Sequence, residues 1–551
     1  MFYRAKLLNY FRQRDRGWLL SLFAAVCIVY LPFLGSPFVF DDLTFFMGDV
    51  AASYGNSWFH FDLRWLPYAS LGWTAAIFSD VVPHFFHLGN ALLHAGSVIL
   101  LFYLLRQLVG AVLIEQKKPK AVIWGAWFGA LLFACHPVAV YAVGYVVQRS
   151  ILMATFSALL MQWAYLRALL TGQRRWLLLA VVAYFMAGFS KEHSVMMPAV
   201  LAAQHVLLRG RSQLALKKMD SRALWLCWGA FLATGLLLVL RAKGVLGAPY
   251  EPMAAFMFEQ QGVVASTPML HLLSALTQAE LFFKYIGLWV LPNPAWMSVD
   301  MRVPFIDSWS AWQGWAGALG FIAYGVMAFR LLLRGGINGL VGLALLYPWL
   351  QFPVELVGIR MQEPFVLYRS YLWVPGMMLF FPILLAMLPG RRTLLALGCT
   401  VLLLVPLAWN RLWVFADNYR LWNDAVLQLP NERIAGADRI FYNRGQAEDA
   451  AHKWDAAAAD YKRVVVISPQ LAPVRYALGM AYVNLGRDQE AMAQFDAGIA
   501  LKPDDARMYF GKGLSLMRLH EREQAQQQMK KACELSNDTA CMMAGWMENK
   551  K

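Results

Sequence analysis

The sequence predicts an all-α protein in two parts, a helical domain that crosses a membrane many times and a soluble array of helical repeats. Apolar runs of about 20 residues, the length of a spanning helix, recur up to about residue 410 and are absent beyond it. Mean hydropathy is +0.45 and 59% of the 551 residues are hydrophobic, which excludes an ordinary soluble protein. After residue 410, several residue types instead recur at intervals of 34 positions, the period of stacked helical hairpins.

Short basic segments between the apolar runs indicate the topology, because Lys and Arg concentrate in cytoplasmic loops. They account for much of the net charge of +15, so the charge does not require a nucleic-acid partner. We therefore predict about eleven spans, with the amino terminus inside and the carboxyl-terminal tail outside. The expected spans lie near residues 18–34, 86–106, 121–136, 150–170, 176–190, 194–208, 223–241, 311–333, 337–353, 371–389 and 393–409. The first has no small-residue cleavage site, so it is predicted to remain as a signal anchor.

An apolar segment near 271–291 is predicted to lie in the outer interface or to re-enter the membrane. Counting it as a span would place Arg330 and Arg334 outside. Of the six cysteines, four lie in apolar runs without metal-ligand spacing and are expected to pack as small core residues. Cys533 and Cys541 lie in the tail, where an oxidising compartment would let them pair, but their spacing leaves this open.

The tail contains positions that repeat with a fixed spacing. Those that recur 34 residues apart are Tyr442, Tyr476 and Phe510; Gly445, Gly479 and Gly513; Ala457, Ala491 and Ala525; and Tyr461, Phe495 and Met529. Small residues at a helix crossing, with Pro469 and Pro503 closing two of the units, are typical of tetratricopeptide repeats. Such arrays present a concave face to a peptide or protein, although a rigid spacer is a competing interpretation.

The predicted organisation is a membrane domain over 1–410, a connecting segment over 411–435 and a repeat domain over 436–551. The repeat units are expected at about 436–469, 470–503 and 504–537, with a last helix that caps them.

Two adjacent carboxylates, Asp41 and Asp42, follow the first predicted span in the sequence Gly-Ser-Pro-Phe-Val-Phe-Asp-Asp-Leu. Carboxylates beside hydrocarbon are costly, so the pair is predicted to lie in water or in a polar cavity on the outer side. One interpretation is that the pair is the catalytic centre of an outward-facing enzyme. The alternative is that it caps a loop helix, since Asp is a favoured N-cap residue.

Three further polar segments fall on the same predicted side, at 135–149, 189–193 and 361–371. The titratable residues of interest in them are His136, Arg149, Lys191, Glu192, His193, Glu363 and Arg369. Charged side chains at a membrane face usually line a cavity and are seldom left unpaired. Simpler roles stay open, with Arg149 and Arg369 as interface anchors and Lys191 paired with Glu192.

Several segments also follow a characteristic order along the chain. They are the Asp pair, Phe86-His-Leu-Gly-Asn90-Ala-Leu-Leu-His94, Phe133-Ala-Cys-His136-Pro-Val, Tyr145-Val-Val-Gln-Arg149, Ser190-Lys191-Glu192, Lys284-Tyr-Ile onward to Asp300, and Tyr368-Arg369-Ser-Tyr371-Leu-Trp-Val-Pro375. The order resembles that of membrane glycosyltransferases of the GT-C fold. With the repeats, it is similar to the transmembrane-and-tetratricopeptide O-mannosyltransferase family and its bacterial relatives, which include pilin glycosyltransferases. Two departures are Tyr141, where the animal family commonly has an acidic residue, and Ser370, within a run expected to be rich in Tyr.

The resemblance implies transfer of one sugar from a polyprenyl-phosphate carrier to a Ser or Thr hydroxyl of a protein, with inversion at the sugar carbon. A carboxylate that takes the hydroxyl proton suits this chemistry, and the catalytic candidates are Asp41 and Asp42. Cations must stabilise the departing phosphate, and the candidates for binding it are Arg149, Lys191 and Arg369. Weaker candidates for substrate contacts are Arg64, His136, Glu192, His193 and Glu363. No cofactor is expected, and no ligand spacing requires a metal, although Asp pairs hold a divalent cation in some relatives of this fold.

Other functions stay open. Sugar transfer to an envelope glycolipid would need no peptide-binding repeats, and a non-catalytic, membrane-anchored scaffold would need the repeats but not the outer charges. The main hypothesis is a protein O-glycosyltransferase of a bacterial inner membrane, with a lipid-linked sugar donor. Its repeats would lie in the periplasm and bind the acceptor protein. A pilin is one candidate acceptor, and the sequence does not identify the acceptor or the modified residue.

Overall fold

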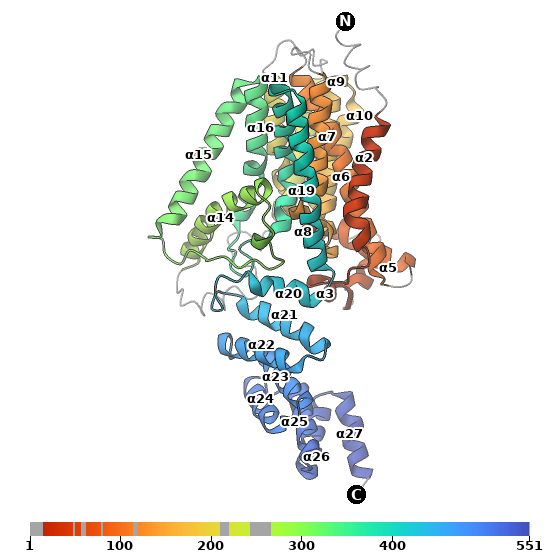
Figure 1. Cartoon of the computed structure of the whole chain (residues 1–551), viewed down its shortest axis with the longest axis vertical. Helices are drawn as coiled ribbons and strands as arrows, with labels where there is room; N and C mark the ends of the chain where they lie inside the picture. The colour runs from red at the N-terminus through yellow and green to blue at the C-terminus, as the bar shows by residue number, and fades with distance from the viewer. Residues whose placement is uncertain are drawn as a thin grey trace. The chain divides into compact units, whose positions relative to one another are not determined.

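The structure is a computed structural model that describes residues 15–47, 50–56, 62–78, 81–113, 119–209, 220–242 and 266–549. Over these ranges it consists of α-helices and 3-10 helices without an extended strand, which confirms the predicted all-α class (Figure 1). The chain divides into two compact units. The first comprises Met1–Val299 and Pro304–Asp417, and the second comprises Asp300–Val303 and Asn418–Lys551.

The first unit is a bundle of long apolar helices with short helices between them (Figure 1). Its α-helices are α2 (Arg16–Tyr30), α3 (Asp41–Met47), α4 (Val50–Gly55), α5 (Trp65–Phe78), α6 (Pro83–Val112), α7 (Pro119–Cys135), α8 (Val140–Val143), α9 (Arg149–Thr171), α10 (Arg174–Ser190), α11 (Met197–Arg209), α12 (Ser221–Arg241), α14 (Thr267–Val290), α15 (Trp312–Arg334), α16 (Gly336–Gln351), α17 (Pro353–Val357), α18 (Phe380–Met387) and α19 (Arg391–Phe415). Its 3-10 helices are η1 (Leu31–Phe33), η3 (Pro137–Ala139), η4 (Val146–Gln148), η5 (Glu192–Met196), η6 (Pro294–Trp296), η7 (Leu367–Leu372) and η8 (Val374–Leu379).

Seven helical segments within the described ranges are long and apolar enough to cross a membrane. They are Arg16–Phe33, Pro83–Val112, Val146–Thr171, Ser221–Arg241, Trp312–Arg334, Gly336–Val357 and Arg391–Phe415. An eighth is added if Pro119–Cys135 and Pro137–Val143, bent by 50°, count as one span. A polytopic membrane domain is confirmed, but the count of eleven is not. α10 and α11 have only 17 and 13 residues, and the span expected near 371–389 contains only the shorter apolar helix Val374–Met387. The segment expected not to span forms α14, which is not among the seven.

Breaks between the long helices place polar residues at helix ends. α10 ends where Lys191 adopts an extended backbone (φ −154°, ψ 124°), and η5 begins at the next residue. Pro353 starts the short helix α17 directly after α16, because Pro is favoured in the first turn of a helix. As a result, Glu192 on η5 and Glu355 on α17 both reach the ring of His193.

The second unit consists of paired helices. They are α20 (Asn418–Leu427), α21 (Ala437–Ala450), α22 (Trp454–Ile467), α23 (Ala472–Asn484), α24 (Asp488–Leu501), α25 (Ala506–Arg518), α26 (Arg522–Glu534) and α27 (Asp538–Asn549). A methyl group on Gly445 or Gly479 would lie 2.7 or 2.5 Å from the ring of Tyr461 or Phe495, so only glycine permits these crossings. The predicted repeats are confirmed as packed helical hairpins.

Two features of the second unit lie outside the repeat pattern. A disulfide joins Cys533 of α26 to Cys541 at α27, a pairing that the sequence left open. Asp300, from the segment Asp300–Val303, lies 2.8 Å from Arg302 and 2.9 Å from Arg439. Within the segment 411–435 that was expected to be a connection, α20 forms part of the second unit.

Candidate active site

Asp42 lies at the start of α3 and is fully buried. Its carboxylate accepts hydrogen bonds from the backbone amides of Val39, Val146 and Val147 at 3.2, 3.3 and 2.7 Å. Burial raises the pKa of Asp42 to about 7, although the three amides oppose the shift. These hydrogen bonds to Asp42 therefore hold the segment after the first span against the segment that follows Tyr145.

Asp41, in contrast, is exposed. Its backbone N–H donates to the hydroxyl of Tyr145 at 3.0 Å. Burial, the charges of Asp41 and Asp42, and a hydrogen bond with the Asp41 side chain raise the pKa of Tyr145 well above its usual value. The two adjacent carboxylates thus occupy different environments, one facing solvent and one held inside the protein.

Tyr368 on η7 connects the region of Asp41 to a buried cation. Its ring lies 6.3 Å from the ring of Tyr145, and the Lys191 ammonium lies 5.5 Å from its centroid. Burial and the charges of Glu363 and Asp41 raise the pKa of Tyr368. Residues that are far apart in the sequence therefore meet around one half-buried tyrosine.

Lys191 is only 3% exposed, and its ammonium makes no hydrogen bond or ion pair with any other described residue. Burial lowers the pKa of Lys191 to about 7. Arg64 and Arg369 lower it further, while Glu192 and Glu363 oppose them. A buried cation without a direct counter-charge is costly, and a bound anion would remove that cost.

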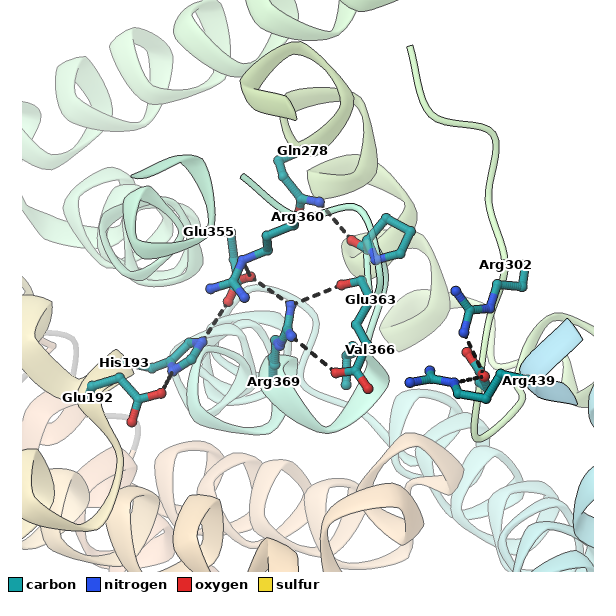
Figure 2. A network of polar contacts seen from close by, with 12 residues as sticks. Glu192, His193, Gln278, Arg302, Glu355, Arg360, Glu363, Val366, Arg369 and Arg439 are labelled. Carbon is teal, nitrogen blue, oxygen red and sulfur yellow. Dashed lines mark hydrogen bonds and ion pairs between the residues drawn. The ribbon is translucent and has the colours of Figure 1, made fainter. Parts of the chain in front are cut away.

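Glu355 on α17 is the centre of a buried ion network that sequence reasoning missed (Figure 2). Its carboxylate is fully buried and lies 2.8 Å from His193 Nε2, 2.8 Å from Arg360 Nε and 3.0 Å from Arg369 Nη1. The only sequence signal was a lone carboxylate two residues beyond a predicted span, where a charge needs partners. Arg360 likewise lies one residue before the polar segment 361–371.

The network continues from Glu355 through the ring of His193. Nδ1 of His193 lies 3.5 Å from Glu192, and Glu192 accepts two hydrogen bonds from Arg64, at 3.0 and 2.5 Å. Burial would raise the pKa of Glu192, but Arg64 holds it well below its usual value. The predicted site residues that the network joins are Arg64, Glu192, His193, Arg369 and Glu363, the last two by a contact of 3.6 Å.

Arg149 begins α9, and its buried guanidinium donates to neutral acceptors. The acceptors are Asn90 Oδ1 at 2.9 Å, the backbone oxygen of Phe86 at 2.9 Å and Thr74 Oγ1 at 3.2 Å. A methyl group on Gly89 would lie 2.8 Å from one of the guanidinium nitrogens, so glycine permits this close approach. These contacts hold α5, α6 and α9 together, and a phosphate contact by Arg149 stays a prediction.

His136 caps the 3-10 helix η3. Its Nδ1 accepts from the backbone N–H of Val138 at 3.3 Å, which leaves the proton on Nε2 for the backbone oxygen of Trp289 at 3.2 Å. The ring also stacks on the Trp289 ring, with 4.3 Å between centroids. Both ring nitrogens are engaged by the backbone, and a substrate contact by His136 stays a prediction.

A cavity of about 620 Å³ adjoins the ion network. Arg64, Glu192, His193 and Arg360 line it together with apolar side chains from α12 and α17. Its volume is within the range of small-molecule sites. Among its described lining residues, neither the Asp pair nor Lys191 is present.

The described residues offer two chemical functions at this end of the first unit. Asp41 is an exposed carboxylate that can accept a proton, and Lys191 is a buried cation that can bind an anion. Within the ranges that the structure describes, no group of three or more His, Cys, Asp or Glu side chains is arranged to hold a metal ion. Metal independence stays a prediction.

Known proteins resemble both parts of the chain. Models of the tetratricopeptide repeat match residues 450–510 and 506–539. Protein O-mannosyl-transferase TMTC3 of Mus musculus is 23% identical over 547 residues, covering 84% of this chain and 56% of that protein. The chain is therefore similar to proteins that combine a transmembrane part with tetratricopeptide repeats. Protein O-mannosyl-transferase Tmtc2 of Drosophila melanogaster is 28% identical over 207 residues, covering 34% of this chain and 21% of that protein.

The chain thus spans little more than half the length of the first of these relatives and about a fifth of the second. Two solved structures also resemble it. MamA is 22% identical (TM-score 0.20) over 30% of this chain and 89% of its own. YrrB, described as a TPR protein with an unusual peptide-binding site, is 20% identical (TM-score 0.22) over 29% of this chain and 87% of its own. At these values neither likeness carries a functional conclusion.

Proposed function

We propose that the chain is a membrane glycosyltransferase that transfers one sugar from a polyprenyl-phosphate carrier to a Ser or Thr hydroxyl of a protein. The mouse and fly relatives are named protein O-mannosyl-transferases, which supports glycosyl transfer to protein. The observation that carries the proposal is that the Tyr368 ring contacts both Tyr145, the hydrogen-bond partner of Asp41, and the ammonium of Lys191. A base beside a cation suits transfer from a phosphate carrier.

In the proposed reaction, Asp41 accepts the proton of the acceptor hydroxyl while the hydroxyl oxygen attacks the sugar carbon. The bond from that carbon to the carrier phosphate breaks, and the phosphate leaves with the electron pair. Lys191 and Arg369 stabilise the developing negative charge. Attack opposite the leaving phosphate inverts the sugar carbon.

Asp42 and Arg149 have supporting roles in this proposal. Asp42, held by three backbone amides, positions Asp41 and takes no part in proton transfer. Arg149 holds the same segment against α5 and α6 through its neutral partners. Both residues would then affect the rate by fixing the geometry of the site.

The repeats are proposed to bind the acceptor protein, for which a pilin is one candidate. Tetratricopeptide arrays commonly present a binding face, and two repeat models match this region. We propose a bacterial inner membrane as the location, with the amino terminus in the cytoplasm and the repeats in the periplasm. The Cys533–Cys541 disulfide supports an oxidising compartment for the repeats.

The test is to replace Asp41 and Asp42 separately by Asn and to measure intact masses of envelope and secreted proteins. Asp41→Asn is expected to abolish a sugar-sized mass increment on an acceptor while the chain remains folded in the membrane. Asp42→Asn is expected to reduce both the increment and the amount of folded chain, because its amide group cannot accept all three backbone hydrogen bonds.

The same experiment separates the alternatives. Unchanged protein masses with a changed envelope glycolipid would favour a lipid acceptor. Unchanged masses of both, with loss of an envelope assembly, would favour a scaffold without catalysis. Either result would overturn transfer to protein as the function of the chain.

A further inference from the structure

Two arginines meet at one indole ring, close to the point where α9 ends and α10 begins (Figure 1). The guanidinium carbon of Arg167 lies 5.5 Å from the ring centroid of Trp163 and 5.5 Å from that of Trp176. The guanidinium carbon of Arg175 lies 5.3 Å from the same Trp176 ring. The rings attract both cations, while the two like charges repel each other.

No described carboxylate balances this pair of charges. The Arg167 guanidinium makes no hydrogen bond or ion pair with any other described residue, and its Nε is buried. Arg175 donates to the neutral side chain of Gln173 at 3.0 Å. Residues 116–191, which include both helices, contain no Asp or Glu. Because a partly buried cation without a counter-charge is costly, the pair favours an anion from outside the chain.

A neighbouring helix brings one carboxylate to this end of α10, but other groups already engage it. Asp220 directly precedes α12, which packs against α10. It pairs with Arg174 at 2.6 Å and accepts a hydrogen bond from the backbone N–H of Arg222 at 3.0 Å. Asp220 therefore serves as the N-cap of α12 and as the partner of a third arginine.

An exposed apolar stripe begins beside the two cations. Leu178 and Val182 are 67% and 46% exposed and lie three and seven residues after Arg175, so the three side chains share one face of α10. Because this helix belongs to a bundle with several membrane-spanning segments, its exposed apolar face meets lipid chains. A cationic head above such a stripe matches the phosphate and the acyl chain of a phospholipid.

The arginine pair lies at the opposite membrane face from the candidate active site. The segment Val146–Thr171 is long and apolar enough to cross a membrane. Arg149 starts α9 at the site, and Arg167 follows 18 residues later, which is about 27 Å along the helix axis. α10 then returns toward the site and ends directly before Lys191.

We propose that Arg167 and Arg175 bind the phosphate of an anionic, two-chain phospholipid in the leaflet opposite to the candidate active site. One acyl chain of this lipid lies along Leu178 and Val182. The planar fork of arginine suits phosphate because it binds two oxygens at once. The bound lipid stabilises the hairpin of α9 and α10, whose other ends reach the candidate active site. This role goes beyond sugar transfer and does not rest on the proposed function.

The test counts phospholipids bound to the purified full chain in detergent by native mass spectrometry during a titration with phosphatidylglycerol. Phosphatidylcholine with the same acyl chains is expected to bind at least about tenfold more weakly, because its ammonium group meets two like charges. An equimolar amount of inorganic phosphate is expected to displace no lipid. Equal binding of phosphatidylcholine would reduce the site to a general lipid contact, and displacement by inorganic phosphate would reduce it to a simple anion site; both overturn the proposal.

Variants assign the headgroup contacts. Arg167→Gln is expected to weaken phosphatidylglycerol binding roughly tenfold or more, and Arg175→Gln, at a more exposed position, is expected to weaken it in the same direction. Arg167→Lys keeps the charge but not the planar fork, so it should restore only part of the affinity. Arg330→Gln on α15 removes an equal charge from an exposed position and should change the affinity less than about twofold. Equal losses in Arg167→Gln and Arg330→Gln would overturn the assignment.

The lipid-dependent part of the stability separates binding from a purely structural role of Arg167. At a phosphatidylglycerol concentration that half-saturates the unmodified chain, the lipid should raise the midpoint of thermal unfolding. The rise should be several times smaller in Arg167→Gln, whatever the stability of that variant without lipid. An equal rise in both chains would overturn the proposal. None of these measurements involves sugar transfer, so the lipid site can fail while the proposed function stands, and the reverse.

Discussion

At the scale of single residues, Lys191 lowers the stability of the folded chain but provides a cation that can bind an anion. Its ammonium is buried beside the Tyr368 ring, and burial brings its pKa down to about 7. Below about pH 7 the folded chain therefore carries a buried cation, which an apolar residue would replace at lower cost. A requirement for an anion-binding group explains why such a residue is kept.

Lys191→Met is expected to raise the free energy of unfolding at pH 7 by roughly 2–4 kcal/mol and to reduce sugar transfer. The pKa of Lys191 is about 7 in the folded chain and about 10.5 when unfolded, so the unfolded chain binds the proton more tightly. Stability of the unmodified chain should rise as the pH increases from 7 toward 10.5, and the variant should lack that rise. A thiol-reactive dye that detects exposure of the buried Cys135 and Cys227 measures this; a less stable variant would contradict it.

Glu355→Gln is expected to lower the free energy of unfolding by roughly 3–5 kcal/mol, because Arg360 and Arg369 lose the carboxylate that they share inside the protein. The same dye assay measures the loss. Asp220→Asn is the control, since the Arg174–Asp220 pair is largely exposed and should contribute less than about 1 kcal/mol. Equal losses in both variants would show that Glu355 is not the centre of a buried network.

At the scale of elements, the helix breaks decide which charges meet. The sequence indicated the long helices because their apolar runs are local patterns, and it indicated the repeats because Gly445, Gly479 and Gly513 recur at a fixed period. It did not indicate the partners of Glu355 or the cavity, because both depend on how α17 packs against segments that are distant in the sequence. Such contacts between distant segments leave no periodic signal.

The same limit applies to the site residues. Their positions near helix ends suggested one polar face, and contacts do join Arg64, Glu192 and His193. The sequence could not show that the Arg149 guanidinium turns to neutral acceptors or that backbone groups engage both nitrogens of His136. Side-chain direction is set by tertiary packing, which residue type and spacing do not determine.

The Cys533–Cys541 disulfide between α26 and α27 predicts that the repeats lie in an oxidising compartment. Cys533 and Cys541 are expected to resist alkylation in the unreduced, denatured chain and to react after reduction, because they form a disulfide. The other four cysteines are free and should react in both cases, which provides the internal control. Mass analysis of the carboxyl-terminal peptides reads the result. Alkylation of both tail cysteines without reduction would argue for a reducing compartment around the repeats.

At the scale of the whole molecule, the two units are compact bodies with separate tasks in the proposed function. The first contains the Asp pair and the ion network, and the second contains the repeats. Catalysis and acceptor capture should therefore be separable by truncation.

Deletion of the residues after 435 is expected to leave the membrane unit folded, since its core lies within Met1–Val299 and Pro304–Asp417. Asp300 would lose Arg439 but keep Arg302. Transfer to a short Ser-containing peptide should continue, while the apparent affinity for the native acceptor should fall. Comparison of KM and kcat for the two acceptors measures this. Unchanged KM for the native acceptor would rule out a binding role for the repeats.

The proposed function depends on Asp41, which takes the acceptor proton in sugar transfer. The most direct measurement is the single-turnover rate with a polyprenyl-phosphate sugar and a Ser-containing acceptor, for the unmodified chain and for Asp41→Asn, with carrier binding measured in parallel. The single-turnover rate of the variant is expected to be lower by roughly 10²–10⁴-fold, with unchanged carrier binding. Transfer by Asp41→Asn at the unmodified rate would contradict it.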